Sequence, residues 1–487
     1  MHAQTTKTYQ RVGRWLGPLV FLIMLLTGSE QDVMSLSAWR TAGIGLWMAI
    51  WWATEAVPVP VTAFIPLITF EPLGVSSLRD AAAPFASPII YLFLGGFMLA
   101  LAVERWDLHR RIALYILNKT GTDGRRLVLG FMVVSGLLSM WMTNTSTTMM
   151  LLPIVLSVVV VIRDNMPELP PEAHRRFEIA MLLGLAYSAS IGGVATLIGT
   201  PPNALLTGYL ADTYNIEISF ARWMWVGLPF SAVMLPVAWW LLTRVLFPVT
   251  IPRSEAVATL LRDSRQQLGP MSTAEKRVAV LFGLVIAGWM LRKSLSAYVP
   301  FLNGLSDAGI VMTAAVLLFV IPSGDKTQGQ LMTWDNATRL PWGVLILFGG
   351  GLSLARGVSQ SGLALWLGES LAPLNAFGIV VLIVAIVALV VLLTELTSNL
   401  ATTATLLPVM GAIALQAGVP PLLLTVPITI AASCAFMLPV ATAPNAIVFS
   451  TGKMTIPDMV KAGIVLNVLC VVLVTIIAIW VVPQALM

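Results

Sequence analysis

The sequence predicts an all-α polytopic membrane protein with about eleven transmembrane helices and two re-entrant hairpins. Of its 487 residues, 57% are apolar and 10% are Asp, Glu, Lys or Arg, whereas a soluble domain carries about 25% charged residues. Apolar runs near the roughly 20-residue length of a spanning helix recur along the whole chain. Two longer apolar stretches, 127–161 and 376–416, carry a polar cluster in their middle, and these are the predicted hairpins.

The spans follow one another with few polar interruptions. A basic segment with Lys7, Arg11 and Arg14 precedes the first span, which we expect to be an N-terminal anchor. Gly and Pro residues interrupt several spans, so their ends are open by a few residues. The predicted spans are 15–28, 41–57, 58–74, 88–104, 179–211, 226–246, 278–291, 307–322, 342–358, 421–449 and 462–482.

The distribution of charge predicts the topology. Basic residues flank the stretch 127–161 on both sides, so the positive-inside rule places both flanks in the cytoplasm, and the stretch must return to the side from which it enters. Ordinary helices through it would put one basic flank outside. The segment 357–452 has no Lys or Arg, which indicates that 376–416 enters from outside. We therefore expect a protein of the inner (plasma) membrane with a cytoplasmic N-terminus and an external C-terminus. Every Lys and Arg then lies inside except Arg40, Arg79, Arg222, Arg292, Lys293 and Arg356.

The composition argues against several functions. The two cysteines, Cys434 and Cys470, allow no disulfide framework and no Cys-based metal site, and His2, His109 and His174 are too dispersed for a His-ligated metal. No nucleophile–base pair lies at membrane depth, which argues against an enzyme. The formal net charge of +5 fits basic cytoplasmic loops, so we expect a lipid environment and no nucleic acid partner.

The two hairpins repeat one pattern in opposite orientations. Thr143-Asn144-Thr145 is followed by Pro153, and Ser398-Asn399-Leu400 is followed by Pro408, nine positions after the asparagine in both cases. Further on, Gly199-Thr200-Pro201-Pro202-Asn203 matches Ala441-Thr442-Ala443-Pro444-Asn445. Inverted repeats, here about 41–250 and 278–487, are typical of secondary transporters whose sites lie at mid-membrane in broken helices. Polar residues that merely join helices are the alternative, but two matched clusters, each with its own helix break, argue against it.

These residues suit a cation and an anion together. The breaks at Pro201-Pro202 and Ala443-Pro444 free backbone carbonyls, which with Ser, Thr and Asn oxygens form a neutral cage for a hard monovalent cation. Helix N-termini at the same breaks favour an anion. We expect the core to hold no Lys, Arg or His next to either cluster, so co-bound cations must supply the charge that neutralises an anion, which is a physical basis for symport.

Two acidic residues fall in or near the predicted spans. Glu395 lies one helical turn before Asn399, where it either tunes a cation site or makes a structural hydrogen bond. Glu55 precedes Val57-Pro58 near the end of a span, where it has either a capping or a functional role.

One further run is similar to the signature of a known family. Ser433-Cys434-Ala435-Phe436-Met437-Leu438-Pro439-Val440-Ala441, followed by Asn445 and Ile447-Val448, resembles the sodium-symporter signature of the divalent anion/sodium symporter family, which includes the bacterial dicarboxylate transporters. The resemblance covers nearly the whole chain, from Thr54-Glu55-Ala56-Val57-Pro58 to the final helix.

The resemblance implies a homodimer in which each protomer has a scaffold domain, 1–126 and 251–375, and a transport domain, 127–250 and 376–487, that moves as an elevator. Segments 105–122 and 358–375 are the implied arms between them. Sodium is the implied coupling ion and a small dianion the implied substrate. Carried over by position, the sodium ligands are Ser139, Thr143, Asn144 and Gly199 in one site and Thr394, Thr397, Asn399 and Ala441 in the other. The substrate-binding residues are Thr143, Asn144, Thr145, Thr200, Pro201, Ser398, Asn399 and Thr442.

The second cluster departs from the family pattern. Leu400 stands where the family has Thr, and Ala443 stands where it has Pro. A C4-dicarboxylate is the leading substrate, but sulfate, or an anion with one apolar end, would tolerate the less polar half of the pocket better. A sodium-independent anion exchanger is a second alternative that would use the same residues. An anion channel is disfavoured, because hairpins that meet at mid-membrane favour a closed site over a continuous pore.

Overall fold

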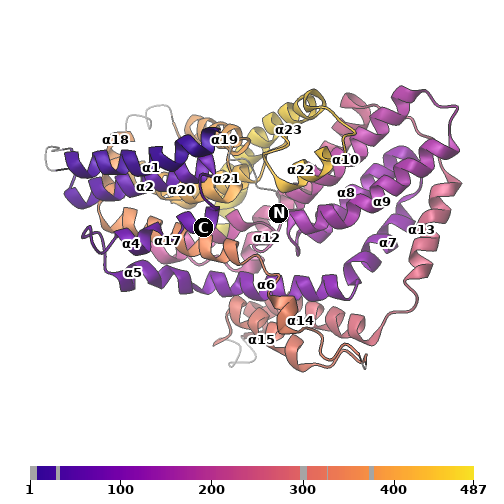
Figure 1. Cartoon of the computed structure of the whole chain (residues 1–487), viewed down its shortest axis with the longest axis horizontal. Helices are drawn as coiled ribbons and strands as arrows, with labels where there is room; N and C mark the ends of the chain where they lie inside the picture. Colours follow the sequence, from indigo (N-terminus) through magenta and orange to yellow (C-terminus); the bar gives the residue numbers. More distant parts are fainter. Residues whose placement is uncertain (1–7, 29–32, 297–303, 326, 372–377) are drawn as a thin grey trace.

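We analysed a computed structural model that describes residues 8–28, 33–296, 304–325, 327–371 and 378–487. Apart from an isolated bridge between Pro322 and Gln330, the regular structure of these residues is helical (Figure 1). The prediction of an all-α chain is therefore confirmed. The first seven residues and residues 372–375 of the second predicted arm lie outside the described ranges.

The first half of the chain contains long helices joined by short ones. Its helices are α1 (Thr8–Thr27), α2 (Leu36–Thr54), α3 (Val59–Thr62), α4 (Ile65–Thr69), α5 (Leu78–Ala82), η1 (Ala83–Ala86), α6 (Pro88–Arg105), α7 (Leu108–Thr120), α8 (Gly124–Ser139), α9 (Asn144–Asn165), α10 (Pro171–Gly193), α11 (Pro201–Tyr214), α12 (Phe220–Trp240) and the π-helical segment η2 (Leu241–Leu246).

The second half begins with a connecting helix and then follows a similar order. Its helices are α13 (Glu255–Gln267), α14 (Thr273–Ser296), α15 (Asp307–Val320), α16 (Trp334–Ala337), α17 (Trp342–Gln360), α18 (Leu363–Leu371), α19 (Ile379–Thr394), α20 (Asn399–Gln416), α21 (Leu422–Ala432), α22 (Ala443–Phe449), α23 (Ile456–Ile476), the π-helical segment η5 (Ile477–Val481) and α24 (Val482–Leu486).

Several predicted spans are interrupted. Each predicted hairpin is two helices, α8–α9 and α19–α20, with a short non-helical segment between them. The predicted spans 179–211 and 421–449 are each broken, into α10 and α11 and into α21 and α22. Pro201 and Pro444 lie in the first turn of the second helix of each pair, where proline fits because its missing N–H has no helical partner. The predicted span 58–74 is wrong as a single helix, since only α3 and α4 form there.

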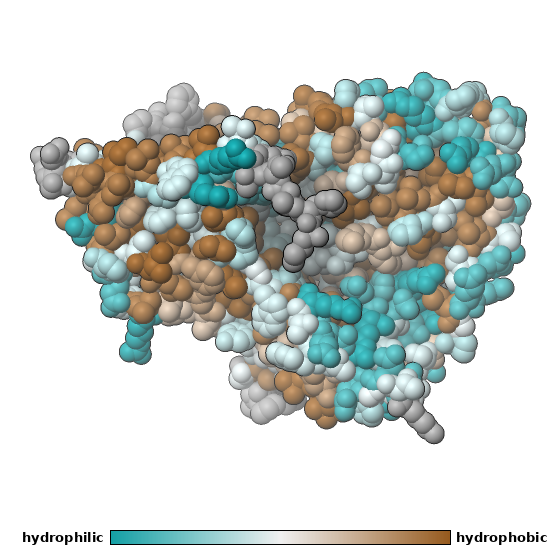
Figure 2. All heavy atoms as spheres, viewed as in Figure 1, coloured by the Kyte–Doolittle hydropathy of each residue, from teal (hydrophilic) through white to brown (hydrophobic). Residues whose placement is uncertain are grey.

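In the described part of the chain, six helices are long and apolar enough to cross a membrane. They include α9 and α20, the second helices of the two hairpins, while α15, α19 and α21 are apolar but shorter. Large apolar side chains are exposed on α1 (Trp15, Leu26) and on the last long helix (Val468, Trp480). Figure 2 shows brown apolar side chains over α1 and α2 and teal hydrophilic side chains at the lower centre. Exposed apolar helices of this kind face lipid rather than water.

Small residues bring the helices around the first hairpin close together. A Cβ added to Gly192 on α10 would lie 2.1 Å from the carbonyl oxygen of Gly136 on α8. Helix backbones approach this closely only where both helices carry small residues. This packing sets the first hairpin tightly against α10.

The connection between the two halves runs beside the first predicted arm. The N–H of Gly124 donates to the carbonyl of Ile251 at 3.0 Å, and the N–H of Ser254 donates to the carbonyl of Thr122 at 3.2 Å. The Arg111 guanidinium of α7 forms an ion pair with the buried Glu275 carboxylate of α14. Helix α13 therefore returns alongside α7 (Figure 1).

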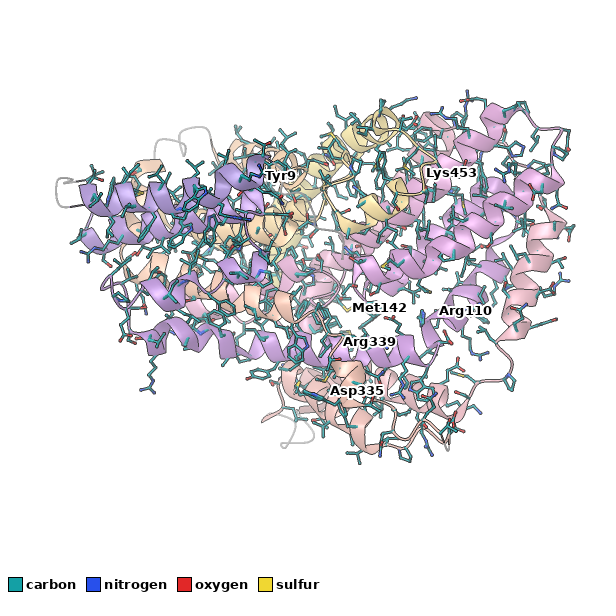
Figure 3. All side chains as sticks on the ribbon, viewed as in Figure 1. Tyr9, Arg110, Met142, Asp335, Arg339 and Lys453 are labelled. Atoms are coloured by element: carbon teal, nitrogen blue, oxygen red, sulfur yellow. The ribbon has the colours of Figure 1, made fainter. Side chains whose placement is uncertain are left out.

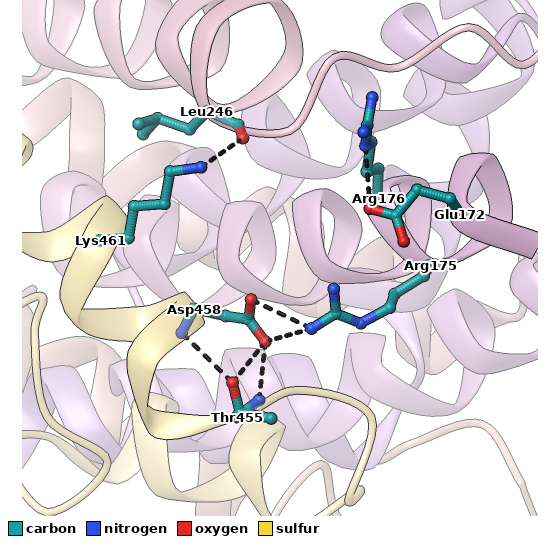
Figure 4. A network of polar contacts seen from close by, with 7 residues as sticks. All are labelled: Glu172, Arg175, Arg176, Leu246, Thr455, Asp458 and Lys461. Carbon is teal, nitrogen blue, oxygen red and sulfur yellow. Dashed lines mark hydrogen bonds and ion pairs between the residues drawn. The ribbon is translucent and has the colours of Figure 1, made fainter.

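Three helix ends are joined by a polar network (Figure 4). Arg175 of α10 pairs with Asp458 of α23 at 2.9 Å, and Lys461 donates to the carbonyl of Leu246 at the end of η2 at 3.4 Å. Arg176 pairs with Glu172 within α10. The small polar cavity between these residues is lined by charges that already have partners.

Candidate substrate and cation site

A cavity of about 830 Å³ lies where the helix breaks meet. On one side it is lined by residues 142–146 and 198–202 of the first half and by residues 396–400 and 440–444 of the second. On the other side lie the end of α2, the second half of α6 and the start of α17. The breaks of four helix pairs that are distant in sequence thus surround one space.

Four helices begin at this cavity. The residues that precede α9, α11, α20 and α22 are Thr143, Thr200, Ser398 and Thr442, and all four line it. Thr143 Oγ1 accepts a hydrogen bond from the N–H of Ser146 at 3.2 Å, and Thr442 Oγ1 accepts one from Asn445 at 3.3 Å. Helix N-termini carry partial positive charge and unpaired N–H groups. The part of the cavity at these four helix starts is therefore electrostatically suited to an anion.

The first cluster gathers oxygens around Asn144. Ser139 Oγ donates a hydrogen bond to Asn144 Oδ1 at 2.5 Å. A Cβ added to Gly193 would lie 2.6 Å from Asn144 Oδ1 and 3.0 Å from the Gly199 carbonyl oxygen, so both oxygens lie against this glycine. Neutral hydroxyl, amide and backbone oxygens at such close quarters are ligands of the kind that hard cations prefer.

The second cluster repeats this arrangement around Asn399. Thr394 Oγ1 is 2.8 Å from Asn399 Oδ1 and also 2.8 Å from the carbonyl oxygen of Ala432. Thr397 Oγ1 lies 2.6 Å from Thr402 Oγ1. Each cluster asparagine thus has a hydroxyl partner five residues earlier in the chain.

Two asparagines that the sequence motif contains, but to which it gave no role, hold the non-helical loops in place. Asn203 Nδ2 donates to the carbonyls of Thr196 at 2.8 Å and Val194 at 3.2 Å. Asn445 Nδ2 donates to the carbonyls of Leu438 and Ala435, both at 3.1 Å. Their matched positions in the two sequence motifs were the signal that could have identified them.

Glu395 makes structural hydrogen bonds, which is one of the two roles that the sequence left open. Its side chain is 1% exposed, and its oxygens accept hydrogen bonds from the backbone N–H groups of Phe436, Met437 and Leu438 at 2.8–3.1 Å. Asn467 Nδ2 donates to the same carboxylate at 2.7 Å. The carboxylate therefore fixes the non-helical segment between α21 and α22, whose N–H groups have no helical partners.

Glu55 ends α2 and also lines the cavity. Its backbone is in the left-handed region, with a φ of 45°, and its N–H donates to the carbonyl of Trp51. Its exposed side chain lies on the side of the cavity formed by α2 and α6. Glu55 therefore both ends helix α2 and contributes its side chain to the cavity wall.

Arg339 is a cavity residue that the sequence did not reveal. It lies just before α17, and among the described residues that line the cavity it is the one with a basic side chain. No basic residue lies next to the clusters in the sequence, but the fold brings Arg339 to the cavity that the clusters line. The expectation that the core holds no basic residue near the clusters is therefore wrong. Both Arg339 and Met142 line the cavity, and Figure 3 shows them close to each other in this view.

The second half of the cavity has an apolar surface. Leu396 and Val440 line it and are 71% and 73% exposed, whereas Leu400 is 6% exposed. The apolar character that the sequence attributed to Leu400 is therefore carried mainly by its neighbours.

The predicted site residues are brought together. Those that line the cavity are Thr143, Asn144, Thr145, Gly199, Thr200, Pro201, Thr397, Ser398, Asn399, Ala441 and Thr442. Ser139 and Thr394 do not line it but are buried behind Asn144 and Asn399, to which their hydroxyls are bonded.

A helical membrane protein with a cavity between interrupted helices, lined in part by Ser, Thr and Asn side chains, has the architecture of a secondary transporter. Residues 10–486 match the family model described as the sodium:sulfate symporter transmembrane region. The chain belongs to this family.

Curated relatives agree with this assignment. The chain is 41% identical over 479 residues to the sodium-dependent dicarboxylate transporter SdcS of Staphylococcus saprophyticus, covering 98% of this chain and 92% of the relative. It is 40% identical over 477 residues to the protein of the same name from Staphylococcus aureus strain USA300, covering 97% and 91%. In both cases the similarity extends over nearly the whole of both proteins.

A solved structure shares the fold at low sequence identity. The YdaH transporter of Alcanivorax borkumensis, whose crystal structure was described as revealing an unusual topology, aligns with a TM-score of 0.56 and 14% identity over 98% of this chain and 99% of that one. This likeness concerns the fold alone.

Proposed function

We propose that this protein is a sodium-coupled symporter of small divalent anions, with C4-dicarboxylates as its substrates. The observation that carries the proposal is that two matched Asn clusters and four helix N-termini meet at the same cavity. The relatives named sodium-dependent dicarboxylate transporters support both the ion and the substrate.

The anion binds between the two clusters. Hydroxyl, amide and backbone N–H donors at the starts of the four helices face its carboxylates, with Thr143, Asn144, Thr145, Thr200 and Pro201 on one side and Ser398, Asn399 and Thr442 on the other. Helix N-termini stabilise anions without full charges. Two carboxylates therefore require additional positive charge close by.

Sodium ions supply that charge. One ion is held by oxygens of Ser139, Thr143, Asn144 and Gly199, and the other by oxygens of Thr394, Thr397, Asn399 and Ala441. Asn144 and Asn399 each belong to both the sodium set and the substrate set. Because anion and cation are adjacent, each raises the affinity for the other, and this reciprocity couples their movement.

Transport proceeds by an elevator movement of residues 127–250 and 376–487 against a scaffold of residues 1–126 and 251–375. The chain crosses the inner membrane eleven times, with two re-entrant hairpins, a cytoplasmic N-terminus and an external C-terminus, and functions as a homodimer. Glu55, Glu104 and Arg339 follow or precede spans at their cytoplasmic ends in this topology, and they line the cavity. The conformation is therefore open to the cytoplasm.

Uptake of labelled succinate into proteoliposomes, with and without an inward sodium gradient, tests the proposal. Sulfate and citrate serve as competitors. We expect succinate uptake only with sodium outside. Uptake that requires internal anion but no sodium would identify an exchanger, and sulfate uptake without succinate uptake would show that Leu400 and its apolar neighbours have changed the substrate.

A further inference from the structure

We infer that Arg339 is a binding residue for the transported anion that contributes only while the cavity faces the cytoplasm. The inference rests on the proposed function and assigns a state-specific contact within it. Its basis is the position of one unpaired guanidinium on the wall of the cavity that faces the two Asn clusters.

The backbone of Arg339 is held firmly on the scaffold side. Arg105 of α6 donates to Asn336 Oδ1 at 2.5 Å and to Gln328 Oε1 at 3.0 Å, which ties the segment before α17 to the end of α6. The N–H of Arg339 donates to the Asn336 carbonyl at 3.1 Å. Its neighbour Leu340 is buried. Arg339 therefore projects from a fixed support.

The guanidinium itself is available to a ligand. Within the described parts of the chain, its side chain forms no hydrogen bond and no ion pair, and it is exposed. The other charged residues that line the cavity, Glu55 and Glu104, are also exposed and have no ion-pair partner among the described residues. The carboxylates of Glu55 and Glu104 repel a dianion. Among the described residues that line the cavity, Arg339 is therefore the one whose full charge attracts the dianion. A guanidinium matches a carboxylate in shape and binds it through two parallel hydrogen bonds.

The contact depends on the conformational state. The Asn clusters belong to the proposed transport domain, whereas Arg339 belongs to the proposed scaffold. Movement of one domain against the other carries the bound anion away from Arg339. The residue therefore raises the affinity for the anion on the cytoplasmic side and leaves the affinity on the external side unchanged.

Membrane vesicles of both orientations test this inference. Sodium-driven succinate transport is measured against succinate concentration in inside-out vesicles, which expose the cytoplasmic face, and in right-side-out vesicles. We expect R339Q to raise KM in inside-out vesicles by roughly tenfold or more, as for loss of a hydrogen bond to a charged group, and to leave KM in right-side-out vesicles unchanged. R339K, which keeps the charge, restores part of the affinity.

A matched control separates this effect from a general loss of surface charge. Arg110 is exposed on α7 and does not line the cavity (Figure 3), so R110Q should leave KM unchanged in both orientations. An equal KM for R339Q and wild type on the cytoplasmic side, or an equal increase on both sides, would overturn the inference while leaving the proposed function intact. Absence of sodium-driven uptake by the wild-type chain would overturn both.

Discussion

The Glu395 carboxylate accepts a hydrogen bond at 2.8 Å from the backbone N–H of Phe436, 41 residues later in the chain. The same carboxylate binds the next two N–H groups, so an ionisable side chain in the middle of an apolar segment replaces the helical hydrogen bonds that the break removes. In the first half of the molecule, a neutral hydroxyl forms hydrogen bonds at the corresponding helix break. Thr196 Oγ1 bonds the Met140 carbonyl and accepts from the Gly199 N–H.

Replacing Glu395 should destabilise the fold. E395A leaves the buried N–H of Phe436 and the partly buried N–H groups of Met437 and Leu438 without their partner. An unpaired buried group costs about 1–3 kcal/mol, so we expect a clear fall in the thermal unfolding temperature of the purified protein. E395Q retains one acceptor oxygen and should fall between E395A and wild type. An unchanged unfolding temperature together with a lost sodium response would instead place this carboxylate at the cation site.

The cluster residues should be required for uptake but not for insertion. Thr145→Ala removes a hydroxyl from the first cluster and Asn399→Ala removes an amide that we propose binds both sodium and substrate, so we expect both variants to reach the membrane and to lose succinate uptake. Ser157→Ala on α9 is the control, because its exposed hydroxyl only bonds the Pro153 carbonyl. Normal uptake by both cluster variants would refute the site assignment.

The loop asparagines should act through positioning. Asn203→Ala removes the amide that holds the 194–200 loop, and Asn445→Ala does the same in the second half. We expect each change to lower the free energy of unfolding by about 1–3 kcal/mol and to raise the sodium concentration needed for half-maximal uptake. Sodium titrations of uptake, read together with thermal unfolding of the same preparations, measure both effects. Unchanged sodium dependence in a destabilised variant would limit these residues to a role in stability.

An aromatic cluster at the tip of the first hairpin should favour the observed state. Trp141 lies edge-on to Phe282 of α14, with ring centroids 5.2 Å apart, and stacks with Trp289 at 6.4 Å. Loss of aromatic contacts worth about 0.5–1.5 kcal/mol predicts that W141A shifts the population roughly two- to tenfold toward the outward-facing state. A cysteine introduced at the exposed Val440 should then react more slowly with a thiol reagent added from the cytoplasmic side. An unchanged rate in W141A, with W141F as the conservative control, would show that this cluster does not hold the state.

Much of the fold was predictable because lipid imposes length and composition on each helix. The predicted spans 88–104 and 342–358 agree closely with α6 (Pro88–Arg105) and α17 (Trp342–Gln360). The helix breaks at Pro201 and Pro444 were also predictable, because proline fits the first turn of a helix and the two prolines lie in matched motifs of the two halves. The span 58–74 was not, because its apolar composition hides the turns that divide α3 from α4. The number of crossings and the domain boundaries stay predictions.

The site residues that occur in both halves of the chain were predictable from the sequence, whereas those that occur in only one half were not. The Asn clusters have matched neighbours in both halves, so the sequence pattern identifies them. Glu395 has no such counterpart, since Met140 holds the equivalent position before Asn144. The backbone N–H groups that bind the Glu395 carboxylate lie about 40 residues later in the chain. Arg339 lies in a loop with no motif of its own, and only the tertiary packing brings it to the cavity.

In the proposed function, the anion and sodium enter together because each neutralises the other in one cavity. The most direct test is uptake of radiolabelled sodium into proteoliposomes, measured with and without external succinate and with the membrane potential clamped at zero. We expect succinate to stimulate sodium uptake and Asn399→Ala to abolish this stimulation. Sodium uptake that is the same with and without succinate, while succinate itself still enters, would contradict the proposed coupling.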